Sequence, residues 1–118
     1  MTLLGLRPPD FRLEAPFAIR VNDLDLFHPA LHVHGEIDIV TARRLAESVD
    51  MDLSWEPLDV VIDLSETTFM DASGITVIVG ARNRLGHSSM VIIRHPSPMI
   101  CRLLNIVGID KVVTIERW

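Results

Sequence analysis

Short apolar runs that alternate with segments of helical period constrain the fold of this chain most strongly. Runs this short and this apolar are typical of buried strands, and they lie at residues 60–64, 90–93 and 112–115. Apolar spacing of three and four residues predicts three helices, over residues 41–53, over residues 73–85, and from residues 96–98 to Gly108. Because parallel strands need long crossover connections, this order predicts a sheet with parallel pairings that helices cover.

The N-terminal part of the chain adds two strands and an arm. Residues 17–21 and 30–35 alternate apolar with small or polar side chains, which is the period of a half-buried strand. Residues 1–16 contain three prolines and no clean period, so we expect an N-terminal arm. The polar residues 65–68 predict a turn after the central strand. We therefore expect one α/β domain over residues 17–118, with a mixed sheet of four to five strands and helices packed against it.

Composition restricts the classes of partner. The 118 residues carry 11 basic and 16 acidic side chains, a net charge of -5, which disfavours neutralisation of nucleic-acid phosphates. The single cysteine, Cys101, has no partner for an internal disulfide, which fits a reducing cytoplasm. No apolar stretch reaches the roughly 18 residues of a membrane span. We expect a cytoplasmic protein with no direct nucleic-acid or membrane binding.

The segment from Asp71 to Gly74 lies between the central strand and the second helix. Loops after the carboxyl ends of strands are where alternating α/β folds tend to bind ligands and partners. Ser73 would sit at or just inside the helix N-terminus, where unpaired backbone N–H groups and the helix dipole favour a negative charge such as a phosphate. Aspartate and serine are also preferred N-cap residues, so either Asp71 or Ser73 could simply cap the helix. The local pattern alone favours the cap.

Four ordered segments extend the pattern over about residues 30 to 115. They are Gly35-Glu36-Ile37-Asp38 followed by Thr41-Ala42, then residues 61–65, residues 69–74, and residues 103–109. Together these segments resemble the STAS domain of bacterial anti-sigma-factor antagonists. The most specific part is the Asp71-Ala72-Ser73-Gly74 segment after the central strand.

The resemblance implies a phosphorylation switch with no catalysis by this chain and no cofactor. It implies that a partner kinase, which is also the anti-sigma factor, phosphorylates Ser73, and that a serine phosphatase acts on phospho-Ser73. The unphosphorylated protein would bind the kinase and so release a sigma factor, which is the partner-switching regulation of transcription in stress responses. Ala72 stands where the family usually has a first serine, which removes an alternative acceptor. The implied partner-binding residues are Asp38, Asp71, Ala72, Ser73 and Gly74.

Two chemical alternatives have weaker support in the sequence. A serine hydrolase elbow needs a glycine two residues before the serine, and Asp71 occupies that position. Neither His87 nor His95 is placed against Ser73 by the sequence. The pair His32 and His34 shares one strand face with a spacing that suits a metal, but no cysteine or acidic cluster completes a site, so we expect ordinary solvent-facing side chains and no metal.

A further alternative keeps the fold and changes the role. A STAS domain without a phosphoswitch could serve as a binding or assembly subunit of a transporter or of a stress-sensing complex, and the presence of Ser73 favours the phospho-regulated class. The apolar connector at residues 24–27 is expected to be a lid on the core in preference to a partner patch. We interpret Arg82 and Arg84 as a solvated helix face and Cys101 as a small buried side chain.

Overall fold

The computed structural model describes residues 17–22 and 27–118. Its elements follow in the order β1 (Phe17–Asn22), β2 (Ala30–Ile37), α1 (Thr41–Leu53), β3 (Asp59–Met70), α2 (Ala72–Arg84), β4 (Met90–Arg94), α3 (Pro98–Ile106), the 3₁₀ helix η2 (Ile109–Lys111) and β5 (Thr114–Glu116). The predicted arm at residues 1–16 and most of the 24–27 connector lie outside the described residues.

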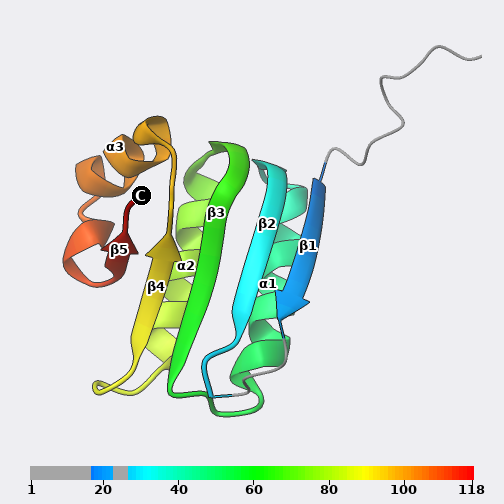
Figure 1. The fold of residues 1–118 in the computed structure, drawn as a ribbon, viewed down its shortest axis with the longest axis vertical. Helices are drawn as coiled ribbons and strands as arrows, with labels where there is room; N and C mark the ends of the chain where they lie inside the picture. The colour runs from blue at the N-terminus through cyan, green and yellow to red at the C-terminus, as the bar shows by residue number, and fades with distance from the viewer. Residues whose placement is uncertain (1–16, 23–26) are drawn as a thin grey trace, which may run out of the picture.

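The strands form one five-stranded sheet in the order β1-β2-β3-β4-β5 (Figure 1). β1 pairs with β2 in the antiparallel direction, whereas β2 with β3, β3 with β4, and β4 with β5 are parallel pairs. Each parallel pair is joined by a crossover that contains a helix, as the sequence pattern requires. The predicted α/β fold with a mixed sheet is therefore confirmed.

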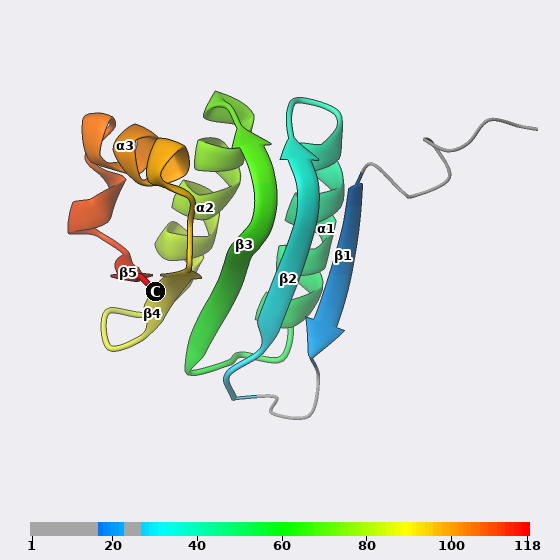
Figure 2. The ribbon, with the colours of Figure 1, turned by 45° about the horizontal axis from the view of Figure 1, so that its top comes forward.

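The core lies between the sheet and the helices on one of its faces. Figure 1 shows α1 and α2 behind the sheet, and Figure 2 shows the same arrangement from a second angle. The strands bury Leu31, Ile62 and Ile93 with no exposed surface, at roughly 1.5–3 kcal/mol for each such side chain. The helix α1 buries the apolar face that its spacing predicted, Ala42, Leu45, Val49 and Leu53. Burial of this face against the strands fixes the position of α1, and therefore of its two ends, relative to the sheet.

The predicted turn at residues 65–68 was wrong, because β3 continues to Met70. Thr67 pairs in register with Gly35 of β2, is 4% exposed, and donates a hydrogen bond from Oγ1 to the carbonyl of Val33 at 2.8 Å. Register shifts between β2 and β3 accommodate this part of the strand. Polar side chains favour a turn locally, but here the pairing with β2 keeps the backbone in the sheet. As a consequence, the strand leads directly into Asp71 and α2.

The C-terminal strand also differs from the prediction. β5 begins only at Thr114, because the chain first forms η2, and the apolar Val112 is 54% exposed. Gly108 follows α3 with φ of 80°, the left-handed conformation that glycine adopts without strain. The predicted end of this helix at Gly108 is therefore confirmed, while the predicted strand over residues 112–115 starts too early.

Candidate functional site

Asp71 is the N-cap of α2. Its backbone is extended, with φ of -110° and ψ of -168°, and its carboxylate Oδ1 accepts a hydrogen bond from the Ser73 backbone N–H at 2.8 Å. Ser73 is thus a residue of the first helical turn and does not cap the helix. Its side chain is half-buried, and its hydroxyl makes no hydrogen bond to any residue that the structure describes. The sequence left Asp71 and Ser73 as equal candidates for the cap, and the geometry separates their roles.

Gly74 lets the start of α2 lie against the ends of two strands. A Cβ at this position would lie 2.5 Å from Met70 Cγ at the end of β3 and 3.0 Å from Ile37 Cγ2 at the end of β2. Side-chain atoms are almost never found this close to a Cβ, so a larger residue would force the helix or its neighbours to move. The glycine of the Asp71–Gly74 segment is therefore explained by close packing beneath the helix N-terminus.

Asp38 closes the turn between β2 and α1. Its Oδ1 accepts hydrogen bonds from the backbone N–H groups of Val40 and Thr41, both at 2.9 Å, and lies 3.1 Å from Thr41 Oγ1. Its own N–H donates to Thr41 Oγ1 at 2.8 Å. The hydrogen bond from the Thr41 backbone is the largest influence on the Asp38 carboxyl, and its pKa lies below its usual value. The side chain therefore stays a carboxylate and holds the turn.

The Asp38 turn and the start of α2 lie at the same edge of the sheet. β2 and β3 are parallel, so their carboxyl ends meet, and Figure 2 shows the two arrowheads side by side. The Asp71 backbone N–H donates to the Ile37 carbonyl at 3.1 Å, which joins the two connections directly. The structure thus brings Asp38 together with the predicted residues Asp71, Ala72, Ser73 and Gly74. Ala72 is exposed beside them.

Two exposed apolar side chains at this edge were missed in the sequence. Ile39 and Val40 lie between Asp38 and Thr41, with 74% and 68% of their surfaces exposed. Consecutive β-branched apolar residues in a turn between two polar residues are unusual, because solvent-facing turns favour polar or small side chains. That local contrast is the signal that would have identified them.

Two of the histidines considered in the sequence contact residues other than Ser73. His32 Nδ1 is 3.4 Å from Asp63 Oδ2, and both His32 and His34 are partly exposed, on the strand face opposite the buried Leu31 and Val33. His95 stacks on Trp118 with 3.8 Å between ring centroids. Among the described residues, no group of three or more metal-ligating side chains could hold an ion, and no histidine hydrogen-bonds the Ser73 hydroxyl.

The remaining candidates have structural contacts. Arg84 forms an ion pair with Asp50 of α1, and Arg82 donates to the carbonyls of Ser89 and Gly86 at 2.6 and 2.9 Å, so these arginines connect elements instead of only facing solvent. Cys101 is partly buried. The described end of the 24–27 connector, Phe27, is 65% exposed, which does not fit a lid on the core.

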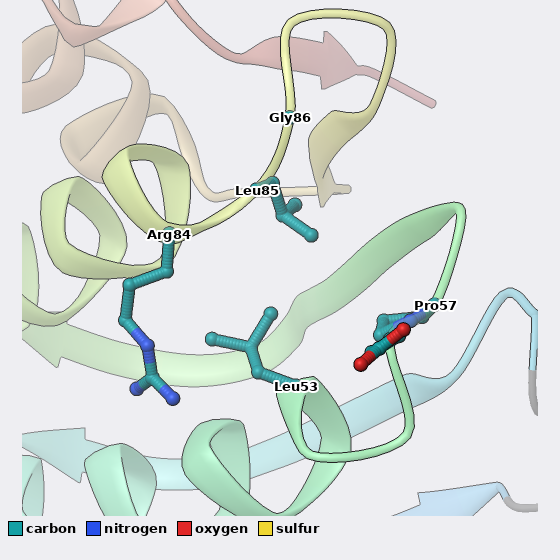
Figure 3. Close-up of a pocket in the computed structure, with 6 residues that line it drawn as sticks. Leu53, Pro57, Arg84, Leu85 and Gly86 are labelled. Atoms are coloured by element: carbon teal, nitrogen blue, oxygen red, sulfur yellow. The ribbon is translucent and has the colours of Figure 1, made fainter.

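A hollow of about 220 Å³ lies at the opposite end of α2 from Ser73. It is lined by Leu53 and Glu56 near the end of α1, by Pro57, and by Arg84, Leu85 and Gly86 after α2 (Figure 3). Ser73 is in the first turn of α2, whereas this hollow borders the last turn. Around Ser73, the turn after β2 and the first turn of α2 present exposed side chains of Ile39, Val40 and Ala72, which suits contact with another macromolecule better than enclosure of a small substrate. No helix in the described part of the chain is both long enough and apolar enough to cross a membrane.

Comparison with known proteins identifies the protein family that has this fold and site. The chain belongs to the STAS domain family, whose model matches residues 19–117. This match confirms the resemblance found in the sequence. The matched residues include β2, which precedes the Asp38 turn, and β3, which precedes α2.

Curated relatives and a solved structure narrow the comparison. The chain is 31% identical over 100 residues to the anti-sigma-B factor antagonist of Listeria monocytogenes, covering 84% of this chain and 88% of the relative. It is 29% identical over 100 residues to the anti-sigma-F factor antagonist RsfB of Mycobacterium tuberculosis, covering 84% and 82%. The crystal structure of an anti-sigma factor antagonist from Mycobacterium paratuberculosis superposes with a TM-score of 0.79 at 28% identity, covering 88% and 90%. These names support an antagonist role.

Proposed function

We propose that this protein is an anti-sigma-factor antagonist whose binding to an anti-sigma factor with serine kinase activity ends when Ser73 is phosphorylated. The observation that carries the proposal is the division of roles at the start of α2. Asp71 occupies the cap position, so the Ser73 hydroxyl is not used to hold the fold within the described residues. A hydroxyl that holds nothing in place can be modified without loss of a structural contact.

The modification is a transfer of one phosphoryl group. The Ser73 Oγ forms a bond to the γ-phosphorus of ATP, the bond between that phosphorus and the bridging oxygen breaks, and ADP leaves. The hydroxyl proton passes to a base that the kinase supplies. A serine phosphatase would reverse the outcome by hydrolysis of the phosphoserine, which returns the hydroxyl and releases inorganic phosphate.

The charge of the product explains why binding would end while the domain stays folded. A phosphate adds about -1.5 to -2 charges at Ser73, next to the carboxylate of Asp71. The N–H groups at the start of α2 offset part of this charge locally, because the positive end of the helix dipole lies there. A partner surface that fits the unmodified hydroxyl would instead meet a bulky, hydrated anion. Binding would be lost by repulsion and by the cost of removing water from the phosphate.

The cellular role follows from the partner. Binding of the kinase by the unphosphorylated protein would release a sigma factor, and phosphorylation would return the sigma factor to inhibition. The names of the relatives support the anti-sigma factor as partner. The chain acts in this scheme as a substrate and binding partner in the cytoplasm, without catalysis or a cofactor of its own and without direct contact to nucleic acid or membranes.

Variants at Ser73 test the proposal. Ser73→Ala should fold, bind the candidate kinase with wild-type affinity, and accept no phosphate when ATP is added. Ser73→Asp should bind at least several-fold more weakly, although one carboxylate reproduces a phosphate incompletely. Binding is measured by calorimetry without ATP, and phosphorylation by intact-protein mass spectrometry.

Ser88 provides the matched control, because it is an exposed serine in the loop beyond the other end of α2. Ser88→Ala should bind and accept phosphate as the wild-type protein does. Phosphorylation of Ser73→Ala to the wild-type level would contradict the proposed switch. A wild-type protein that does not bind the kinase would contradict the antagonist role and would favour a STAS assembly subunit.

A further inference from the structure

The turn after β2 presents two apolar side chains on a backbone that is held in place. Ile39 and Val40 are among the most exposed large apolar residues in the described chain, at 74% and 68%. Their backbone is fixed on both sides, because Asp38 Oδ1 accepts from the N–H groups of Val40 and Thr41, and Thr41 Oγ1 donates to the Glu36 carbonyl at 2.7 Å. A fixed turn loses little conformational entropy on binding, which favours its use in an interface.

This turn lies within the area that a protein bound at Ser73 must cover. The Asp71 N–H donates to the Ile37 carbonyl at 3.1 Å, and Ile39 is two residues beyond Ile37, a span of at most about 7 Å. A stable protein interface buries roughly 800 Å² on each partner. A kinase that is seated on Ser73 with an interface of that size therefore reaches the turn.

We infer that the anti-sigma factor packs an apolar surface against Ile39 and Val40, and that Asp38 supports binding by holding this turn and not by contacting the partner. The inference rests on the proposed function and deepens it. The resemblance implied that Asp38 is a partner-binding residue, whereas its Oδ1 already accepts hydrogen bonds from two backbone N–H groups of its own turn. Asp38 is thus a positioning residue, and the contact belongs to its two apolar neighbours.

Substitution of the apolar side chains tests the contact. Ile39→Ser and Val40→Ser should each weaken binding of the candidate kinase by about tenfold or more, as expected when an apolar side chain that is buried in an interface is replaced by a polar one. Leu58→Ser is the matched control, because Leu58 is 56% exposed but lies before the start of β3, on the order of 40 Å from Ser73 along the strand. The control should bind within about threefold of the wild-type protein.

Two substitutions of Asp38 separate a positioning role from a charged contact. Asparagine keeps an Oδ1 acceptor and is a good residue for this type of turn, so Asp38→Asn should bind within about threefold of wild type. Asp38→Ala removes the acceptor and should weaken binding by about tenfold. If the carboxylate charge itself contacted the partner, both variants would lose affinity equally, and that result would overturn the positioning role.

The outcomes distinguish this inference from the proposed function. Wild-type protein that fails to bind the kinase overturns both. Wild-type protein that binds and is phosphorylated, while Ile39→Ser and Val40→Ser bind equally well, overturns only the inference. A loss of affinity in Leu58→Ser as large as that in Ile39→Ser and Val40→Ser would also overturn only the inference. If Ile39→Ser instead abolishes self-association in sedimentation and leaves kinase binding intact, the turn contacts a second copy of this chain, which also overturns the inference.

Discussion

A comparison of Asp71→Ala with Ser73→Ala tests the assignment of roles at the start of α2. Asp71 Oδ1 accepts the Ser73 N–H at 2.8 Å, and the Ser73 hydroxyl has no hydrogen-bond partner among the described residues. Removal of the Asp71 carboxylate leaves a backbone donor of the first turn without its partner. Removal of the Ser73 hydroxyl leaves every described hydrogen bond in place. The two alanine variants should therefore differ in stability, although they lie two residues apart.

The magnitudes follow from the measured cost of N-cap substitutions. Loss of an aspartate cap costs about 1 kcal/mol of unfolding free energy, within a range of about 0.5–2. For a domain of this length, that corresponds to a decrease in Tm of about 4 °C. Ser73→Ala should change the unfolding free energy by less than about 0.5 kcal/mol, with a small gain because alanine has the higher helix propensity. Asp71→Asn keeps a capping oxygen and should fall between the two.

Unfolding in guanidinium chloride, followed by far-UV circular dichroism, measures these differences at constant m-value. The expected order of stability is Ser73→Ala at or slightly above wild type, then Asp71→Asn, then Asp71→Ala. Equal destabilisation by Ser73→Ala and Asp71→Ala would refute the reasoning. That result would show that the hydroxyl holds the helix, and a residue needed for the fold is a poor place for a reversible phosphate.

Three further predictions concern packing and charge. Gly74→Ala should destabilise the domain by about 1–2 kcal/mol, because the overpacking cost exceeds the gain in helix propensity, and thermal unfolding measures the loss. Burial raises the pKa of the Asp63 carboxyl, but hydrogen bonds from Ser65 together with the charges of His32 and His95 lower it by more, so the folded-state pKa lies below the unfolded value. Stability should therefore fall as pH decreases from about 4 through that lower pKa, and Asp63→Asn should flatten this part of the stability profile. Burial raises the pKa of the Asp52 carboxyl, whose Oδ2 has no hydrogen-bond partner among the described residues. The stability that the protonated Asp52 contributes is therefore lost as pH rises through the folded-state pKa. Asp52→Asn, which carries no charge, should increase the Tm at pH 7 relative to wild type.

Much of the fold could be predicted because burial imposes a period on the sequence. The spacing of Ala42, Leu45 and Val49 identified α1, and the apolar run at residues 60–64 identified the buried part of β3. The second part of β3 could not be predicted in this way. There the strand carries polar side chains, and only its pairing with β2, which lies far away in the sequence, keeps the backbone extended.

The candidate site was predictable as a location and not as an assignment of roles. A serine and an aspartate at a helix start are equivalent as candidate caps, and only the backbone geometry shows that Asp71 accepts the hydrogen bond. The role of Asp38 was likewise hidden, because a carboxylate in a motif gives no sign of whether it faces a partner or its own turn. Ile39 and Val40 were missed because their exposure depends on how that turn is held.

Mapping of the phosphate on the wild-type protein tests the central claim most directly. The protein is incubated with its candidate kinase and ATP, and the modified residue is located by tandem mass spectrometry of the peptides. The account predicts a single phosphate, on Ser73, and a phosphorylated protein that remains folded and no longer binds the kinase. Phosphate at another residue, no phosphate with a kinase shown to be active, or a phospho-Ser73 protein that binds unchanged would contradict it.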